Sequence, residues 1–357
     1  MILKTIQEKL KRTDLSALLI VDPINLRYVT GLTLSSAALI VGPSSAYLFV
    51  DRRYALMAES LNSSFQIHVG TRSDIRDKTV RILEQIRGKI GFDGANMSYG
   101  YHQNLLHQSS SLSLTDSPLF FSHLRRQKSP EEVSKIQAAC RICEKGVAHL
   151  LNHLRPGVTE KQLERELKLF WFTHGADDIS FPPIIAFGPN SACPHWECSE
   201  TPLKKNSVIL IDIGVQKNGY HSDMSRVIFY GDVGNELQAC WKHVEETFRK
   251  VVELAKPGIL PYELDRYARE HLASCGYEKA FSHGLGHGVG MQIHEHPRLS
   301  PEMPDEGSLE IGDVITIEPG LYLEGKGGIR LEDTFVVEKE GVRSLFSLPS
   351  ELIQIDV

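Results

Sequence analysis

Two hydrophobic patterns alternate along the first 120 residues of the chain. Stretches with apolar residues at helical spacing begin at the N-terminus, after Arg52 and at Ser73. Between them lie short apolar runs that predict β-strands, at 17–22, 37–42, 46–51, 65–70 and 89–94. This alternation predicts an α/β domain.

A helix-start signature follows this first region. In the segment HLRRQKSPEE, Ser129 can cap a helix whose first position is proline and whose first turn carries two glutamates. We therefore place a domain boundary near Gln127, which predicts a first domain at 1–127 and a second at 128–357.

The second region repeats its own pattern. The segments RPGVTEKQLERELKLFWFTHG and KPGILPYELDRYAREHLASCG share a Pro-Gly turn and an amphipathic helix that ends at glycine. An apolar strand follows each of them, at 207–214 and at 313–320. We expect the second domain to consist of two copies of one helix–helix–hairpin unit.

Each copy places a pair of acids on its predicted hairpin. Asp212 and Asp223 flank the turn QKNG in the first copy, and Glu318 and Glu332 flank the turn EGKGG in the second. Side chains alternate between the two faces of a strand, so each pair is expected on one face. Two divalent cations would balance the four negative charges that these residues bring to one buried place.

Two registers are compatible with the first hairpin. A turn centred on Lys217 and Asn218 sets the two aspartates directly opposite each other, whereas a two-residue loop of Asn218 and Gly219 shifts the pairing by two residues. Both registers keep the aspartates on one face. In the second hairpin, a turn centred on Gly325 sets the two glutamates opposite each other.

The segment FSHGLGHGVGMQIHEH, between the two hairpins, supplies histidines as further ligand candidates. It contains His283, His287 and His294 among glycines that allow a close approach of the backbone. Its glycine spacing does not fit a dinucleotide-binding loop, and its histidine spacing does not fit a zincin helix.

Composition limits the class of protein. The 357 residues carry 39 Lys and Arg against 45 Asp and Glu, so a nucleic-acid partner is not expected. No apolar run is long enough to span a membrane and no secretory signal is visible, which predicts a cytoplasmic protein. The six cysteines, with Cys140 and Cys143 inside a predicted helix, are expected to be reduced thiols.

These motifs resemble those of the pita-bread metallopeptidases, which include Xaa-Pro aminopeptidase, Xaa-Pro dipeptidase (prolidase) and methionine aminopeptidase. The blocks LIDIG, HSDMSR, HGLGHGVG, TIEPGLY and IRLEDT follow the family's order of metal ligands. NLRYVTGL and FVDRRY are similar to the creatinase/prolidase-type domain of the Xaa-Pro enzymes. The resemblance implies an α+β fold, in which a pita-bread domain with an internal pseudo-twofold repeat follows a smaller α/β domain.

The resemblance also implies roles for individual residues. The implied metal ligands are Asp212, Asp223, His287, Glu318 and Glu332, with Asp223 and Glu332 bridging two ions and Glu318 also moving a proton. Three histidines are implied as catalytic residues on the substrate side: His195 and His294, which also bind the substrate, and His283, which lines the pocket. Arg330 is implied to orient a ligand aspartate. Tyr322 is expected to serve packing.

The donor set and the family suggest further properties. Oxygen ligands with a single imidazole favour two Mn²⁺ ions per subunit, with Co²⁺, Fe²⁺ or Zn²⁺ as alternatives. By resemblance, the protein acts on proline-containing peptides and forms a homodimer. SDMSR carries serine where the family usually has threonine, which retains the hydroxyl group.

The resemblance leaves the exact activity open between family members. We expect an Xaa-Pro aminopeptidase. Xaa-Pro dipeptidase is the alternative, because Arg298 resembles the arginine that binds the carboxylate of a dipeptide. A pita-bread binding module without catalysis is a more remote alternative. The complete ligand set argues against that module and against creatinase-like hydrolases, which share the fold without the metals.

Overall fold

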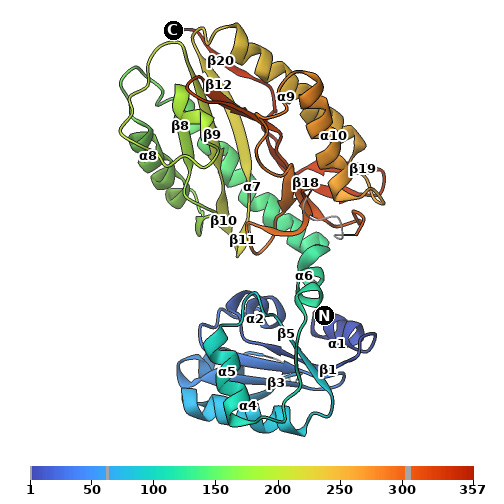
Figure 1. The fold of residues 1–357 in the computed structure, drawn as a ribbon. Helices are drawn as coiled ribbons and strands as arrows, with labels where there is room; N and C mark the ends of the chain where they lie inside the picture. The colour runs from blue at the N-terminus through green and yellow to red at the C-terminus, as the bar shows by residue number, and fades with distance from the viewer. Residues whose placement is uncertain (1, 62–63, 302–306) are drawn as a thin grey trace. The chain divides into compact units, whose positions relative to one another are not determined.

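The computed structural model describes residues 2–61, 64–301 and 307–357. The chain divides into two compact units, Met1–Leu124 and Arg125–Val357. Figure 1 shows the N-terminal unit in blue to cyan and the C-terminal unit in green to red.

The N-terminal unit is built on one six-stranded sheet with the order β4-β3-β2-β1-β5-β6. The pairs β1–β2 and β2–β3 are antiparallel, and the other three pairs are parallel. The strands are β1 (Leu15–Ile20), β2 (Ala37–Val41), β3 (Ala46–Asp51), β4 (Gln66–Gly70), β5 (Lys89–Phe92) and β6 (Leu114–Asp116). Apolar clusters form from alternating residues of these strands, such as Leu18 and Leu19, because their side chains point to opposite faces.

Helices cover this sheet, and their starts follow ordinary capping chemistry. Asp22 accepts a hydrogen bond from the backbone of Asn25 at the start of α2, and Thr71 and Asp74 form a capping box at the start of α4. The helical segments up to the second unit are α1 (Ile2–Leu10), α2 (Pro23–Thr30), η1 (Arg52–Tyr54), α3 (Ala55–Glu59), α4 (Arg72–Gln85), α5 (Tyr99–Gln108) and α6 (Pro118–Arg126).

Four long helices pack around the sheets of the C-terminal unit (Figure 1). They are α7 (Pro130–Leu151), α8 (Glu160–Thr173), α9 (Asn235–Leu254) and α10 (Pro261–Ser274), and a short helix η2 (Gly188–Ala192) follows β8. Ser129 caps α7 through a capping box with Glu132, which confirms the predicted helix start. Apolar faces of α9 and α10 meet the strands in a core that includes Trp241, Leu264 and Phe335.

The strands of the C-terminal unit form several sheets. One sheet has the order β20-β12-β9-β8 and another β14-β13-β15-β18-β19, with smaller sheets β11-β10-β7 and β16-β17. The strands of the first half are β7 (Asp178–Ile179), β8 (Ile184–Phe187), β9 (Ser207–Ile213), β10 (Val215–Lys217), β11 (Tyr220–His221) and β12 (Met224–Tyr230). Those that follow are β13 (Gly286–Gly288), β14 (Glu295–Leu299), β15 (Val314–Ile317), β16 (Gly320–Leu323), β17 (Gly327–Arg330), β18 (Asp333–Glu338), β19 (Gly341–Ser344) and β20 (Ile353–Ile355).

The predicted internal repeat is visible in the backbone. Gly157 and Gly258 have φ angles of 85° and 93°, and each donates a 2.9 Å hydrogen bond from its amide, to the carbonyls of Leu203 and Leu309 respectively. The glycines that end the second helix of each copy, Gly175 and Gly276, have φ angles of 94° and 90°. Left-handed backbone favours glycine, which explains why the same residue stands at both places in both copies.

The structure decides the register of both hairpins. Asp212 pairs with Ser225, so the two-residue loop of Asn218 and Gly219 sets the first hairpin, and direct pairing of Asp212 with Asp223 is wrong. Asn218 and Gly219 both have positive φ angles, which a two-residue turn of this kind requires. In the second hairpin, the register that was predicted around Gly325 is confirmed by the pairs Ile317–Asp333 and Gly320–Arg330.

Within the described residues, none of the helices is long and apolar enough to cross a membrane. Cys140 and Cys143 are buried in α7 as free thiols. Burial raises the pKa of both thiols well above its usual value, so they are inert packing residues.

Candidate active site

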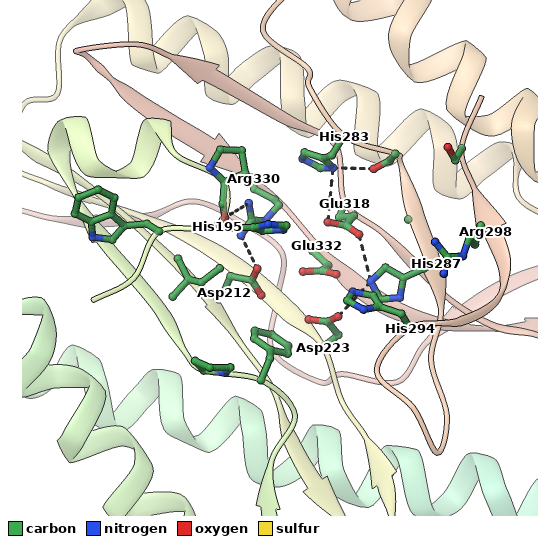
Figure 2. A pocket seen from close by; sticks show the side chains of 18 of the residues that line it. His195, Asp212, Asp223, His283, His287, His294, Arg298, Glu318, Arg330 and Glu332 are labelled. Carbon is green, nitrogen blue, oxygen red and sulfur yellow. Dashed lines mark hydrogen bonds and ion pairs between the residues drawn. The ribbon is translucent and has the colours of Figure 1, made fainter. Parts of the chain in front are cut away.

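A pocket of about 520 Å³ lies in the C-terminal unit between the two halves of the repeat. All ten site residues that the sequence analysis proposed line this pocket (Figure 2). Five apolar residues also line the pocket and form what we call its apolar wall: Phe181, Pro182, Ile184, Pro194 and Trp196.

Strand ends hold the five predicted metal ligands. Asp212 is the last residue but one of β9, and Asp223 directly precedes β12. Glu318 directly follows β15, Glu332 lies between β17 and β18, and His287 is the middle residue of β13. Strand ends allow these side chains to converge while the apolar residues of the same strands remain in the core.

The distances confirm that three segments far apart in sequence meet here. His287 Nε2 lies 3.5 Å from Asp223 Oδ2 and 3.5 Å from Glu318 Oε1. One ligand atom from each of Asp223, His287 and Glu332 lies within 4.8 Å of the others. His287 Nδ1 lies 3.1 Å from the Gly288 carbonyl, so it carries the proton and leaves the Nε2 lone pair facing the carboxylates.

The clustered acids raise each other's pKa. Burial, followed by the charges of Asp212 and Glu318, raises the pKa of Asp223 well above its usual value. Burial, followed by the charges of the neighbouring acids, also raises the pKa of Glu332 well above its usual value. The pKa of Glu318 rises to about 8, chiefly through burial. Burial also lowers the pKa of His287 to about 3, which keeps this imidazole neutral.

Comparison with known proteins identifies the family to which this chain belongs. The model of metallopeptidase family M24 matches residues 134–339, and that of the creatinase/prolidase N-terminal domain matches residues 2–127. The chain belongs to metallopeptidase family M24. It is therefore a metal-dependent hydrolase, with the pita-bread fold behind a creatinase-type N-terminal domain.

Individual relatives match almost the whole peptidase. The Xaa-Pro dipeptidase of Pyrococcus horikoshii is 32% identical over 352 residues, which cover 98% of each chain. A solved structure of the Xaa-Pro dipeptidase from Bacillus anthracis superposes with a TM-score of 0.93 at 27% identity over 99% of each chain. The X-Pro aminopeptidase from Thermotoga maritima has a TM-score of 0.87 at 29% identity, covering 98% of this chain and 99% of its own.

The residues of the M24 pocket fit a divalent metal. Four carboxylates and one neutral imidazole form a donor set that suits Mn²⁺ or a similar cation. Asp212 Oδ1 is buried without a hydrogen-bond partner among the described residues, as expected for a ligand atom. Burial and the charges of neighbouring acids raise the pKa values of Asp223 and Glu332, and a bound cation would offset both effects.

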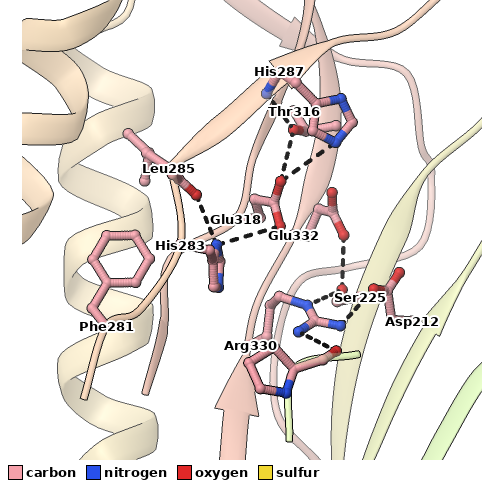
Figure 3. Close-up of polar contacts among 12 residues, drawn as sticks. Asp212, Ser225, Phe281, His283, Leu285, His287, Thr316, Glu318, Arg330 and Glu332 are labelled. Carbon is pink, nitrogen blue, oxygen red and sulfur yellow. Dashed lines mark hydrogen bonds and ion pairs between the residues drawn. The ribbon is translucent and has the colours of Figure 1, made fainter. Parts of the chain in front are cut away.

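Arg330 links the two halves of the site (Figure 3). Its guanidinium donates to Asp212 Oδ2 at 2.5 Å and to Ser225 Oγ at 2.9 Å. The Ser225 hydroxyl in turn donates to Glu332 Oε2 at 2.7 Å. The arginine therefore contacts the aspartate that the sequence analysis expects it to orient, and Ser225 holds a carboxylate of the other half.

Tyr322 differs from its expected packing role. Its hydroxyl accepts a 2.7 Å hydrogen bond from Arg330 Nη1 and lies 2.8 Å from His283 Nε2. Its ring does pack against the core, so the residue joins packing to the polar network. The sequence showed no sign of this, because Tyr322 and Arg330 meet only through pairing of β16 with β17.

The three substrate-side histidines occupy different environments. Both nitrogens of His283 are engaged, Nδ1 with the Gly284 carbonyl at 2.7 Å and Nε2 with Tyr322. His294 is exposed at the pocket, where its ring meets the edge of His287 at a centroid distance of 4.4 Å. His195 is also exposed and lines the pocket without a hydrogen bond to any described residue.

Buried acids that the sequence analysis missed anchor the segments that carry these histidines. Glu160, at the start of α8, accepts hydrogen bonds from Trp196 Nε1 at 2.9 Å and from the Ser199 amide at 3.0 Å, both just after His195 in the chain. Asp265 accepts from the Leu285 amide at 3.0 Å, and Glu295 accepts from Arg125 at 3.2 Å and from Lys128 at 3.3 Å. These contacts fix the loops from outside the pocket.

Arg298 lies on β14 directly opposite His287. Its side chain is exposed at the pocket, and no acidic residue in the described part of the chain pairs with it. Its charge contributes to lowering the pKa of both His287 and His294. A guanidinium without an acidic partner among the described residues, beside a cluster of candidate metal ligands, is suited to bind a substrate carboxylate.

Proposed function

We propose that this peptidase is an Xaa-Pro dipeptidase that uses two divalent metal ions. The observation that carries the proposal is Arg298, a guanidinium without an acidic partner among the described residues, opposite the ligand His287. A dipeptide has its carboxylate directly on the prolyl residue, within reach of such a group. The names of the relatives in Pyrococcus horikoshii and Bacillus anthracis favour this activity, the alternative of the sequence analysis.

In this proposal the five ligands divide between two ions. Asp223 and Glu332 would be shared by both ions, since both are buried and the charge of Asp223 contributes to raising the pKa of Glu332. Asp212 would complete the set of ligands of one ion, and His287 with Glu318 that of the other. When bound, the two ions supply Lewis-acid polarisation of the scissile carbonyl and lower the pKa of an attacking water. Mn²⁺ is the ion we expect, from the oxygen-rich donor set.

The chain's own residues orient the substrate and move the proton. Arg298 binds the carboxylate of the dipeptide, and the apolar wall with Phe181 and Trp196 excludes water from the scissile bond. Glu318 accepts the proton of the attacking water and passes it to the prolyl nitrogen, so that the C–N bond breaks and proline leaves as a secondary amine.

The exposed histidines act on the tetrahedral intermediate that forms when water attacks the scissile carbonyl. Burial, followed by the charge of Arg298, lowers the pKa of His294, so its imidazole is neutral at pH 7 and donates from its N–H. We assign His294 and His195 to the oxyanion of the tetrahedral intermediate. His283 is a positioning residue, because both its nitrogens are already engaged.

The test compares an Xaa-Pro dipeptide with an Xaa-Pro-Xaa tripeptide after Mn²⁺ loading, with and without EDTA. We expect chelator-sensitive cleavage of the dipeptide and a lower kcat/KM for the tripeptide. Arg298→Met should lower kcat/KM for the dipeptide by roughly 10-fold to 100-fold, the effect of one charge-assisted hydrogen bond, and change tripeptide cleavage little.

Arg266→Met is the matched control, because Arg266 is an exposed arginine on α10 and does not line the pocket. A preference for the tripeptide in the wild type, with no selective loss in Arg298→Met, would make the protein an aminopeptidase. Absence of cleavage of either peptide would favour a binding module.

A further inference from the structure

A second group of possible metal ligands lies away from the pocket, where the end of α7 meets α8. One ligand atom from each of His149, His153 and Glu166 lies within 4.8 Å of the others. His149 is in the last turn of α7, His153 follows two residues after the helix, and Glu166 is in the middle of α8. None of these residues lines the active-site pocket.

Stacked rings hold this group in place. The ring of His149 lies between His153 and Phe170, with centroid distances of 4.3 and 4.4 Å. Phe170 stacks on His174 at 3.9 Å on its other side. Glu166, Phe170 and His174 are spaced by four residues along α8, so they lie on one helix face.

The hydrogen bonds leave imidazole nitrogens available. His153 Nδ1 lies 2.8 Å from the His149 carbonyl, which places the proton on Nδ1 and the lone pair on Nε2. His149 Nε2 is buried and has no hydrogen-bond partner among the described residues. Simple packing of aromatic rings does not explain a buried nitrogen that nothing satisfies.

We propose that His149, His153 and Glu166 bind a Zn²⁺ ion that joins the end of α7 to α8. Two imidazoles and a carboxylate form a familiar zinc donor set, which leaves a fourth position for water. Ligand atoms of a tetrahedral zinc lie roughly 3.3 Å apart, so small side-chain rotations close the group around the ion.

The surroundings favour a cation at this place. The carbonyl end of a helix carries partial negative charge, and His149 and His153 stand at that end of α7. The internal repeat gives no second copy, because Lys250, Leu254 and Tyr267 stand 101 positions after the three ligands.

Equilibrium dialysis of the full-length, chelator-stripped protein against Zn²⁺ tests this site by counting bound zinc per chain. His153→Ala and Glu166→Gln should each bind one zinc fewer than the wild type and lose part of the zinc-dependent rise in Tm. Both changes lie at exposed or half-buried positions, so two independent folded variants are available.

His174→Ala is the matched control, because this histidine stacks on the same phenylalanine but lies outside the ligand group. It should bind as much zinc as the wild type, and all three variants should hydrolyse peptide within about twofold of the wild-type rate after Mn²⁺ loading. Equal zinc content in wild type, His153→Ala and Glu166→Gln would overturn the proposal, as would an equal loss in His174→Ala.

Discussion

The two halves of the C-terminal unit bring their acids to the pocket in different registers. In the second half, the pairing places Glu318 opposite Glu332, and Arg330 stands two residues before Glu332. In the first half, Asp212 pairs with Ser225, and the acid Asp223 occupies the position two residues earlier. Asp223 therefore corresponds to Arg330 by register, and Ser225 corresponds to Glu332.

This offset explains how a duplicated hairpin becomes one asymmetric site. An exact repeat of the second half would place two acids opposite each other in both halves, with an arginine instead of an acid at position 223. Here the serine of the first half receives a hydrogen bond from Arg330 and donates one to Glu332. The two halves thus exchange contacts, and neither forms the ligand set alone.

Removal of the metal ions should abolish peptide hydrolysis and lower the stability of the protein, because the clustered acids then lack a balancing charge. The pKa of Glu318 in the metal-free protein is about 8, above its value in the unfolded chain. A raised pKa gives stability that is complete below the unfolded value and lost as the pH rises through the folded value. The Tm gap between Mn²⁺-loaded and chelated protein should therefore widen from pH 5 to pH 8, and a constant gap would contradict it.

Loss of either acid that we propose to bridge the ions, one from each half, should have the same large effect. Asp223→Asn and Glu332→Gln are each expected to lower kcat by about a thousandfold or more, because several kcal/mol of metal-ion stabilisation are lost. Steady-state kinetics at saturating Mn²⁺ measures this. Glu338→Gln is the control, since Glu338 pairs with Arg343 on the exposed end of β18. A large loss in one variant only would show that the halves contribute unequally.

Arg330→Met should have a smaller effect than either bridging variant. The arginine orients Asp212 and Ser225 without itself being a ligand, and residues in that position typically account for roughly 10-fold to 100-fold in metal affinity or activity. Titration of the stripped protein with Mn²⁺, followed by activity, measures the shift. Unchanged Mn²⁺ affinity in this variant would exclude the idea that Arg330 helps to assemble the metal site from the two halves.

Ser225 gives the finest test of the exchange between halves. Ser225→Ala removes one hydrogen bond to Glu332, which corresponds to about a tenfold loss of kcat/KM. Ser225→Thr keeps the hydroxyl and is expected to retain activity. If the threonine variant falls as far as the alanine variant, space at this buried position, rather than the hydroxyl, determines the result.

Much of this site was accessible from sequence because it depends on local spacing. The capping signal at Ser129, the glycine pairs of the repeat and the alternation of strand faces are local patterns, and each predicted its element correctly. The register of the first hairpin needed one further choice, which the positive φ angles of Asn218 and Gly219 decide.

The missed features depend on contacts between distant residues. The bonds from Ser225 to Glu332 and from Arg330 to Tyr322, and the anchoring of the His195 segment by Glu160, follow from packing of elements onto one another. No periodicity or motif in one sequence encodes such partners. The polar role of Tyr322 belongs to the same class, because its ring satisfied an apolar pattern.

A crystal structure of the Mn²⁺-loaded peptidase, with anomalous data at the manganese edge, would show whether both halves hold the metal ions. We expect two anomalous peaks, both in contact with Asp223 and Glu332, one also with Asp212 and the other with His287 and Glu318. A single peak, or peaks held by the acids of one half only, would contradict a shared site built from two offset hairpins.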